Sequence, residues 1–178
     1  EMIANRSFQY TEIAENDELY GWKTVGGAVN EVIKDDKENY LNINNTNYLV
    51  MKNTSSEKAG IENRGFLDGM AVKENESYNI SFYAKAADYS GKFTVRLAVN
   101  GEAQAEKILI DEISENWNKY TLTITSPVTA HEGVTLQLLI EEGEVCFDMI
   151  SMFPESTFKG RENGMRNDLG TMLEELQP

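Results

Sequence analysis

Apolar and polar residues alternate along most of this chain, and turn-forming residues interrupt the alternation about every ten positions. The clearest examples are residues 78–85, 93–99, 120–125 and 134–141. A period of two places one set of side chains on a buried face and the other set toward solvent or a partner. The segments between them contain Asp, Asn, Gly, Ser or Pro, and no helical pattern intervenes. We therefore predict an all-β domain over residues 1–154, an antiparallel β-sandwich of the jelly-roll type. The polar, Asn-rich segment 35–47 is predicted to be an exposed loop.

The period changes after Pro154. Met165, Leu169, Met172, Leu173 and Leu176 follow the spacing i, i+4, i+7, i+8 and i+11, which is typical of one apolar stripe on an amphipathic helix. Asn163 or Gly164 can cap its start, and Pro178 marks its end. Residues 155–178 are thus expected to be a linker and one C-terminal α-helix. The stripe has to pack either on the sandwich or on a neighbouring domain.

The charge balance restricts the partners. The 178 residues include 16 Lys and Arg against 30 Asp and Glu, a formal net charge of −14. Nucleic-acid binding normally requires a basic surface, and none is evident. Anionic membrane surfaces are disfavoured for the same reason, and no apolar run is long enough to cross a bilayer. We expect no nucleic-acid and no membrane partner, whereas neutral polar ligands such as sugars remain compatible.

Nothing in the sequence predicts an active site. His131 is the single histidine, so it is the one candidate base for a serine or cysteine nucleophile. Cys146 is the single cysteine, which excludes an internal disulfide. Neither a nucleophile elbow nor a phosphate-binding glycine loop is present. The acidic residues fall mainly in turns, where solvated charge is expected, so this stretch of chain is predicted to be non-catalytic.

Four residues are candidates for a sugar-binding surface. Tyr83 alternates with the other aromatic residues of its predicted strand, so its side chain should point to the opposite face. Lys85 shares the face of Tyr83. Arg96 and Gln137 occupy equivalent outward-facing positions on other predicted strands. One aromatic ring with Lys, Arg and Gln on the outer face of a sheet suits an oligosaccharide groove. The alternatives are an ordinary solvated face or a face covered by a neighbouring domain.

Asp148 is a candidate metal ligand. It lies within the apolar segment 145–150, where an unpaired buried charge would be costly. A Ca²⁺ ion, which prefers oxygen ligands, would neutralise it. A basic partner or an outward-facing position would serve equally well.

Both ends of the chain resemble a known enzyme family. Residues 1–9, 147–154 and 157–161 resemble segments of α-L-arabinofuranosidases of glycoside hydrolase family 51, and residues 163–169 resemble the start of that family's first barrel helix. Residues 60–66, 69–72 and 78–85 are similar to carbohydrate-binding modules of the family 4, 9 and 22 type. The resemblance implies a non-catalytic sandwich inserted into a catalytic barrel, with both ends close together. It also implies that the catalytic glutamates lie beyond Pro178.

The resemblance bears on calcium as well. In related modules a glutamate follows the first-strand phenylalanine and helps the Asp of the last strand to bind a structural Ca²⁺. In this chain Phe8 is followed by Gln9, while Asp148 is present. The resemblance therefore implies a structural Ca²⁺ site at Gln9 and Asp148, weakened by the loss of one negative charge. No other cofactor is expected.

Two functions follow as hypotheses. The first is a carbohydrate-binding domain that holds arabinose-containing plant polysaccharide near the catalytic barrel of an α-L-arabinofuranosidase. The alternative is a structural or oligomerisation domain that braces the barrel without binding glycan. The alternative predicts that the surface carrying Tyr83, Lys85 and Arg96 is covered or disorganised.

Overall fold

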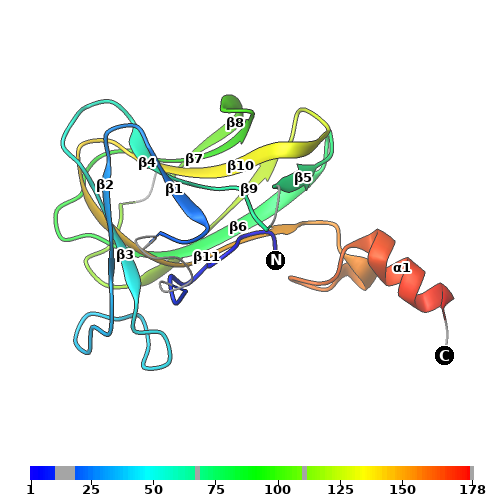
Figure 1. Cartoon of the computed structure of the whole chain (residues 1–178), viewed down its shortest axis with the longest axis horizontal. Coiled ribbons are helices and arrows are strands. Elements are labelled where there is room, and N and C mark those ends of the chain that lie inside the picture. Colours follow the sequence, from blue (N-terminus) through cyan, green and yellow to red (C-terminus); the bar gives the residue numbers. More distant parts are fainter. Residues whose placement is uncertain (11–18, 67–68, 110–111, 177–178) are drawn as a thin grey trace.

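Two antiparallel sheets pack face to face in the computed structural model, and helix α1 (Asn167–Glu175) stands away from them at one end (Figure 1). The structure describes residues 1–10, 19–66, 69–109 and 112–176. The predicted β-sandwich with one C-terminal helix is confirmed.

Sheet A has the strand order β1-β4-β10-β7-β8, with β5 paired to β10, and sheet B has the order β2-β3-β11-β6-β9. The strands of sheet A are β1 (Trp22–Val25), β4 (Ala59–Asn63), β5 (Met70–Val72), β7 (Phe93–Val99), β8 (Glu102–Leu109) and β10 (Ala130–Ile140). The strands of sheet B are β2 (Val29–Ile33), β3 (Tyr48–Asn53), β6 (Ser77–Lys85), β9 (Asn118–Thr125) and β11 (Gly143–Pro154). Neighbours within each sheet are mostly distant in sequence, as expected of a jelly roll.

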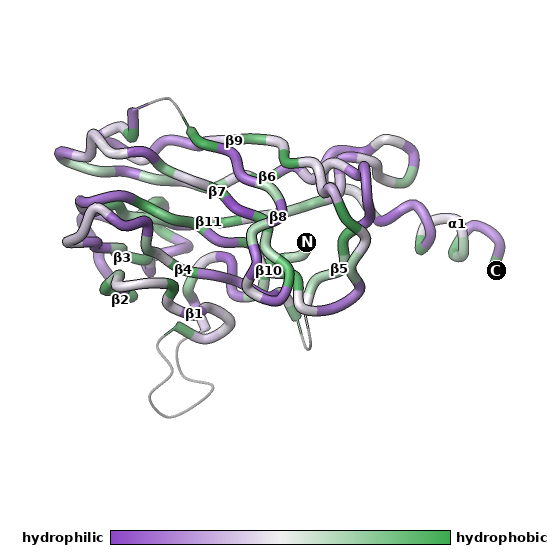
Figure 2. The backbone as a smooth tube through the Cα atoms, turned by 90° about the horizontal axis from the view of Figure 1, so that it is seen from above, coloured by the Kyte–Doolittle hydropathy of each residue, from purple (hydrophilic) through white to green (hydrophobic). Residues whose placement is uncertain are grey.

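The core lies between the two sheets and follows the alternation of the sequence (Figure 2). The inward ring of Phe82 on β6 lies 4.9 Å from the ring of Phe93 on β7 and 5.9 Å from that of Phe147 on β11. These rings join sheet B to sheet A, and aromatic contacts of this kind stabilise beyond the area they bury. The turn between β7 and β8 also follows the sequence, because Asn100 and Gly101 have the positive φ angles that a tight hairpin requires.

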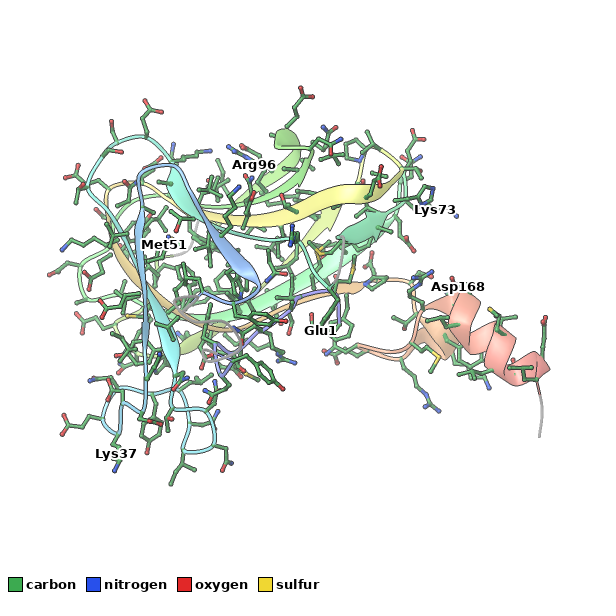
Figure 3. All side chains as sticks on the ribbon, viewed as in Figure 1. Glu1, Lys37, Met51, Lys73, Arg96 and Asp168 are labelled. Carbon is green, nitrogen blue, oxygen red and sulfur yellow. The ribbon has the colours of Figure 1, made fainter. Side chains whose placement is uncertain are left out.

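The start of the chain runs beside the last strand. The backbone N–H of Met2 donates to the carbonyl of Met152 at 3.0 Å, and that of Ile150 donates to the carbonyl of Arg6 at 2.9 Å. The Glu1 carboxylate accepts the Met152 N–H at 3.1 Å. Residue 1 therefore lies close to the end of β11 (Figure 3), as the resemblance implied.

Helix α1 is shorter than the sequence pattern suggested. Its N-cap is Arg166, so Asn163 and Gly164 precede the helix and do not cap it. Pro178, the expected stop, lies outside the described residues. None of the described helices is long and apolar enough to cross a membrane.

The apolar stripe of α1 does not pack on the sandwich. Gly170 is the buried residue of the helix, and it faces Phe158 in the short 3-10 helix η1 (Phe158–Gly160). The stripe residues are between 46 % and 73 % exposed: Met165, Leu169, Met172, Leu173 and Leu176. Of the two expected packing arrangements, the one on the sandwich is therefore wrong.

Candidate functional site

The four predicted ligand residues lie on two different surfaces. Tyr83 and Lys85 are on β6, on the outer face of sheet B, whereas Arg96 on β7 and Gln137 on β10 are on the outer face of sheet A. Alternation along a strand separates inward-facing from outward-facing side chains, but it does not show which sheet the strand joins. The chain crosses from sheet B to sheet A between β6 and β7. The expectation that all four line one groove is therefore wrong.

On sheet A, outward side chains from four adjacent strands form one hydrogen-bonded row. Gln137 donates to the Glu62 carboxylate at 3.0 Å and accepts from Arg96 at 3.3 Å. Arg96 Nε in turn donates to Glu106 Oε1 at 2.5 Å, and Lys58 lies 3.5 Å from the other oxygen of Glu106. We call Glu62, Gln137, Arg96 and Glu106, with Lys58 at its end, the polar row.

The polar row differs in exposure along its length. Gln137 is only 4 % exposed, whereas the side chain of Arg96 is 24 % and that of Glu106 is 34 % exposed. Arg96 lowers the pKa of the Glu106 carboxyl, against the opposing effect of burial. The row is thus fixed at its centre and accessible toward Arg96 and Glu106.

On sheet B, Lys85 is occupied by contacts within the protein. Its ammonium lies 5.5 Å from the ring centre of Tyr48 and 5.1 Å from that of Trp117. Both Lys85 Nζ and Trp117 Nε1 donate to the carbonyl of Asn39, at 3.1 Å and 2.7 Å. A cation held between two rings and a carbonyl contributes to stability. Lys85 therefore holds a loop in place, and its role in ligand binding stays a prediction.

That loop, residues 34–47 between β2 and β3, we call the strap. Asp36 accepts the Tyr48 hydroxyl at 2.8 Å and the backbone N–H groups of Glu38 and Asn39 at 2.8 Å and 2.9 Å, contacts that hold the pKa of the Asp36 carboxyl well below its usual range. Lys37 marks the far tip of the strap in Figure 3, on the opposite side of the molecule from Arg96.

The strap is only partly the exposed loop that the sequence predicted. Asn45 and Asn47 are buried, with Asn45 donating to Asp148 and Asn47 donating to the carbonyl of Phe8 at 3.0 Å. Buried amides need partners of this kind. The strap thus contacts Lys85, which stays half-buried, whereas Arg96 lies on the other sheet, and ligand binding by either residue stays a prediction.

Asp148 faces outward on β11 and is nevertheless completely buried beneath the strap. Its carboxylate accepts the Asn45 amide at 2.5 Å and the Met149 backbone N–H at 2.7 Å. Burial raises the pKa of Asp148 to about 7, although these two hydrogen bonds and the charge of Arg6 oppose the rise. Asp148 is accordingly held by N–H donors.

Gln9 does not join Asp148. It is exposed, its amide lies 3.5 Å from the carbonyl of Ser7, and no hydrogen bond links it to Asp148 among the described residues. No group of three or more His, Cys, Asp or Glu is placed to hold a metal in that part of the chain. The geometry thus offers one of the two expected side-chain ligands, and Ca²⁺ binding stays a prediction.

The exposed aromatic side chains lie elsewhere. Tyr83 is half-buried between Asp148 and Lys119 of the neighbouring strands. The strongly exposed rings of the described residues belong to Tyr10, Tyr20 and Phe66, all outside strands. The alternation of inward and outward side chains applies to strands alone, so it could not have identified these exposed rings.

No hydrogen bond links His131, the candidate base, to Cys146 among the described residues. His131 is exposed, and burial raises the pKa of the Cys146 thiol to about 11, so Cys146 is not a thiolate at neutral pH. These two residues therefore do not form a nucleophile and base pair.

Comparison with known proteins decides the family. Residues 1–143 match the family model CBM_4_9, described as a carbohydrate binding domain. This chain belongs to that family.

Relatives of the domain are arabinofuranosidases. It is 31 % identical to an extracellular exo-α-L-arabinofuranosidase of Streptomyces chartreusis over all of its own length and 20 % of the enzyme. It is 26 % identical to α-L-arabinofuranosidase 2 of Arabidopsis thaliana over all of its length and 27 % of that protein. The domain thus spans between a fifth and just over a quarter of these two relatives.

Solved structures of glycoside hydrolases contain domains similar to this one. An arabinose-bound α-L-arabinofuranosidase, MgGH51, superposes with a TM-score of 0.86 and 26 % identity over 99 % of this domain and 30 % of that chain. A xylanase fragment with a CBM22-1 module, solved with xylohexaose, matches with a TM-score of 0.53 and 15 % identity over 76 % of this domain and 26 % of that chain, which shows the fold alone.

Proposed function

We propose that the domain binds a neutral oligosaccharide or polysaccharide on the outer face of sheet A, as part of an α-L-arabinofuranosidase acting on arabinose-containing plant polysaccharide. The family and the arabinofuranosidase relatives support the ligand class. The observation that carries the location is the polar row, which sets hydrogen-bonding groups from four strands side by side.

The polar row has the chemistry that a polyhydroxylated ligand needs. The carboxylates of Glu62 and Glu106 can accept further hydrogen bonds, and the guanidinium of Arg96 has five N–H donors, while each sugar hydroxyl both donates and accepts. The side chains already hold one another in place, so less conformational freedom is lost on binding. Two basic and two acidic groups balance within the row, which favours a neutral ligand.

Hydrogen bonding has to dominate on this face. None of the outward side chains in the described strands of sheet A is aromatic, and Ile108, 45 % exposed, is the large apolar group next to the row. We therefore expect modest affinity for soluble oligosaccharides.

Isothermal calorimetry and affinity electrophoresis with arabinoxylan, arabinan and xylan test the proposal. The wild-type domain should bind at least one of them, and Arg96→Ala should weaken binding about tenfold or more through loss of charged hydrogen bonds. Lys52→Ala, an exposed change on the outer face of sheet B, is the matched control. Absence of binding at millimolar oligosaccharide would defeat the function, and equal binding by Arg96→Ala would defeat the location.

We also propose that the apolar stripe of α1 packs on the catalytic barrel of the same chain. The stripe has no cover among the described residues of the domain. The match to the arabinose-bound enzyme covers 99 % of the domain but 30 % of that enzyme, so the enzyme has further chain that can cover the corresponding helix.

A further inference from the structure

Two exposed tyrosines lie where the N-terminal segment meets β1, and their backbones are bonded to the same side chain. Tyr10 is 60 % and Tyr20 is 37 % exposed. The side-chain nitrogen of Asn5 donates to the carbonyl of Tyr10 at 3.1 Å and to that of Tyr20 at 2.8 Å. The amide oxygen of Asn5 accepts the Tyr10 N–H at 3.1 Å. One buried amide thus fixes the backbone of both tyrosines.

The base beneath these tyrosines is rigid. Asn5 is only 7 % exposed and has a positive φ angle, and its carbonyl accepts the indole N–H of Trp22 at 3.0 Å. The Trp22 ring lies 5.5 Å from the ring of Phe8 in the core. Asn63 of β4 adds a further bond, donating to the carbonyl of Gly21 at 2.9 Å. Tyr10 and Tyr20 therefore project from backbone that the core holds in place.

The rings of Tyr10 and Tyr20 have no specific partner in the described part of the domain. Neither tyrosine hydroxyl forms a hydrogen bond, and neither ring stacks on another aromatic ring, among the described residues. Both rings therefore leave apolar area exposed to solvent on a fixed backbone, and this area is accessible to a ligand. The exposed amide of Gln9 is adjacent in sequence and can serve a ligand hydroxyl.

We propose that Tyr10 and Tyr20 form a stacking platform for the sugar rings of a neutral glycan. The inference rests on the proposed function, and it adds the aromatic contact that the polar row lacks. Aromatic side chains offer a large apolar face at small conformational cost, with a hydroxyl at the rim. The net charge of −14 disfavours an anionic ligand at this platform.

The test is calorimetry of the domain with oligosaccharides of arabinoxylan, arabinan and xylan. Tyr10→Ala and Tyr20→Ala should each weaken binding about two- to tenfold, whereas Tyr10→Phe and Tyr20→Phe, which keep the ring, should retain most of the affinity. Val29→Ala removes an exposed apolar group on β2 and is the matched control, with no change expected. Circular dichroism and thermal unfolding verify that each variant is folded.

The outcomes separate this inference from the proposed function. Wild-type binding with unchanged affinity in both alanine variants overturns the platform and leaves glycan binding intact. Binding that Arg96→Ala weakens and the tyrosine variants do not also overturns it. Failure of the wild type to bind any glycan removes the proposed function and the platform together.

Discussion

The buried carboxyl of Asp148 should make the stability of the domain fall as pH rises from about 4 to about 7. In the folded state its pKa is raised to about 7, whereas a carboxyl in the unfolded chain titrates near the ordinary value of about 3.9. The folded state therefore binds the proton more tightly, and the free energy of unfolding decreases with pH across this window. Above pH 7 the ionised group is buried and the decrease is complete.

The magnitude follows from the size of the shift. A rise of about three pKa units corresponds to about 4 kcal/mol, of which about 3 kcal/mol falls between pH 4.5 and pH 8. Asp148→Asn removes the titration and keeps the shape. The substituted amide can accept the Met149 N–H and donate to Asn45 once the Asn45 amide is turned over, so both hydrogen bonds of Asp148 can be retained.

The assay is urea unfolding of both proteins in EDTA at pH 4.5, 6 and 8. Relative to Asp148→Asn, the wild type should lose about 3 kcal/mol of stability across the series, because the other titrating groups cancel in the difference. A difference that stays constant, or one that favours the wild type as pH rises, would refute the reasoning. Calcium binding at Asp148 would favour the ionised carboxylate, so added Ca²⁺ at pH 8 should then stabilise the wild type and leave the variant unchanged.

Three further outcomes are expected. Trp117→Leu removes a ring contact with Lys85 and a hydrogen bond to the strap, and should lower the free energy of unfolding by about 1–2 kcal/mol in urea; an unchanged midpoint would mean that the strap needs no such anchor. Gly170→Ala would place a methyl group in steric conflict with the Phe158 ring, so hydrogen exchange in α1 should accelerate while the melting temperature of the sandwich holds; a lower melting temperature would show that α1 supports the sheets. Leu173→Asp should leave the 178-residue chain within about 0.5 kcal/mol of wild type, yet destabilise a longer chain that includes the barrel; equal stability of both longer chains would contradict docking through α1.

The candidate site was less predictable than the fold. The alternation of apolar and polar residues identified Arg96 and Gln137 as outward-facing, and the structure joins these two in one row. The partners that complete the row, Glu62 and Glu106, come from β4 and β8, whose pairing with β10 and β7 spans many residues of sequence. No local pattern signals such a pairing, so the row was not visible in the sequence.

The strap shows the same limit for buried polar groups. Its composition indicates an exposed loop, and most of it is exposed. What buries Asn45 and Asn47 is the presence of Asp148 and the Phe8 carbonyl beneath them, which are partners from distant parts of the chain. The tyrosine pair was missed for a related reason, because Asn5 brings Tyr10 and Tyr20 together across a segment without strand periodicity.

By itself the sequence determined the sandwich, the inward face of each main strand, the apolar stripe of the C-terminal helix and the acidic surface. All of these follow from the geometry of a few successive residues or from composition. Only the tertiary structure decided that Tyr83 and Arg96 face opposite sides, that Lys85 contacts the strap and Asp148 is buried beneath it, and that Asn5 binds the backbones of both Tyr10 and Tyr20. The local backbone sets which face of a strand a side chain points to. Contacts between residues far apart in the chain decide which sheet the strand joins and which loop covers it.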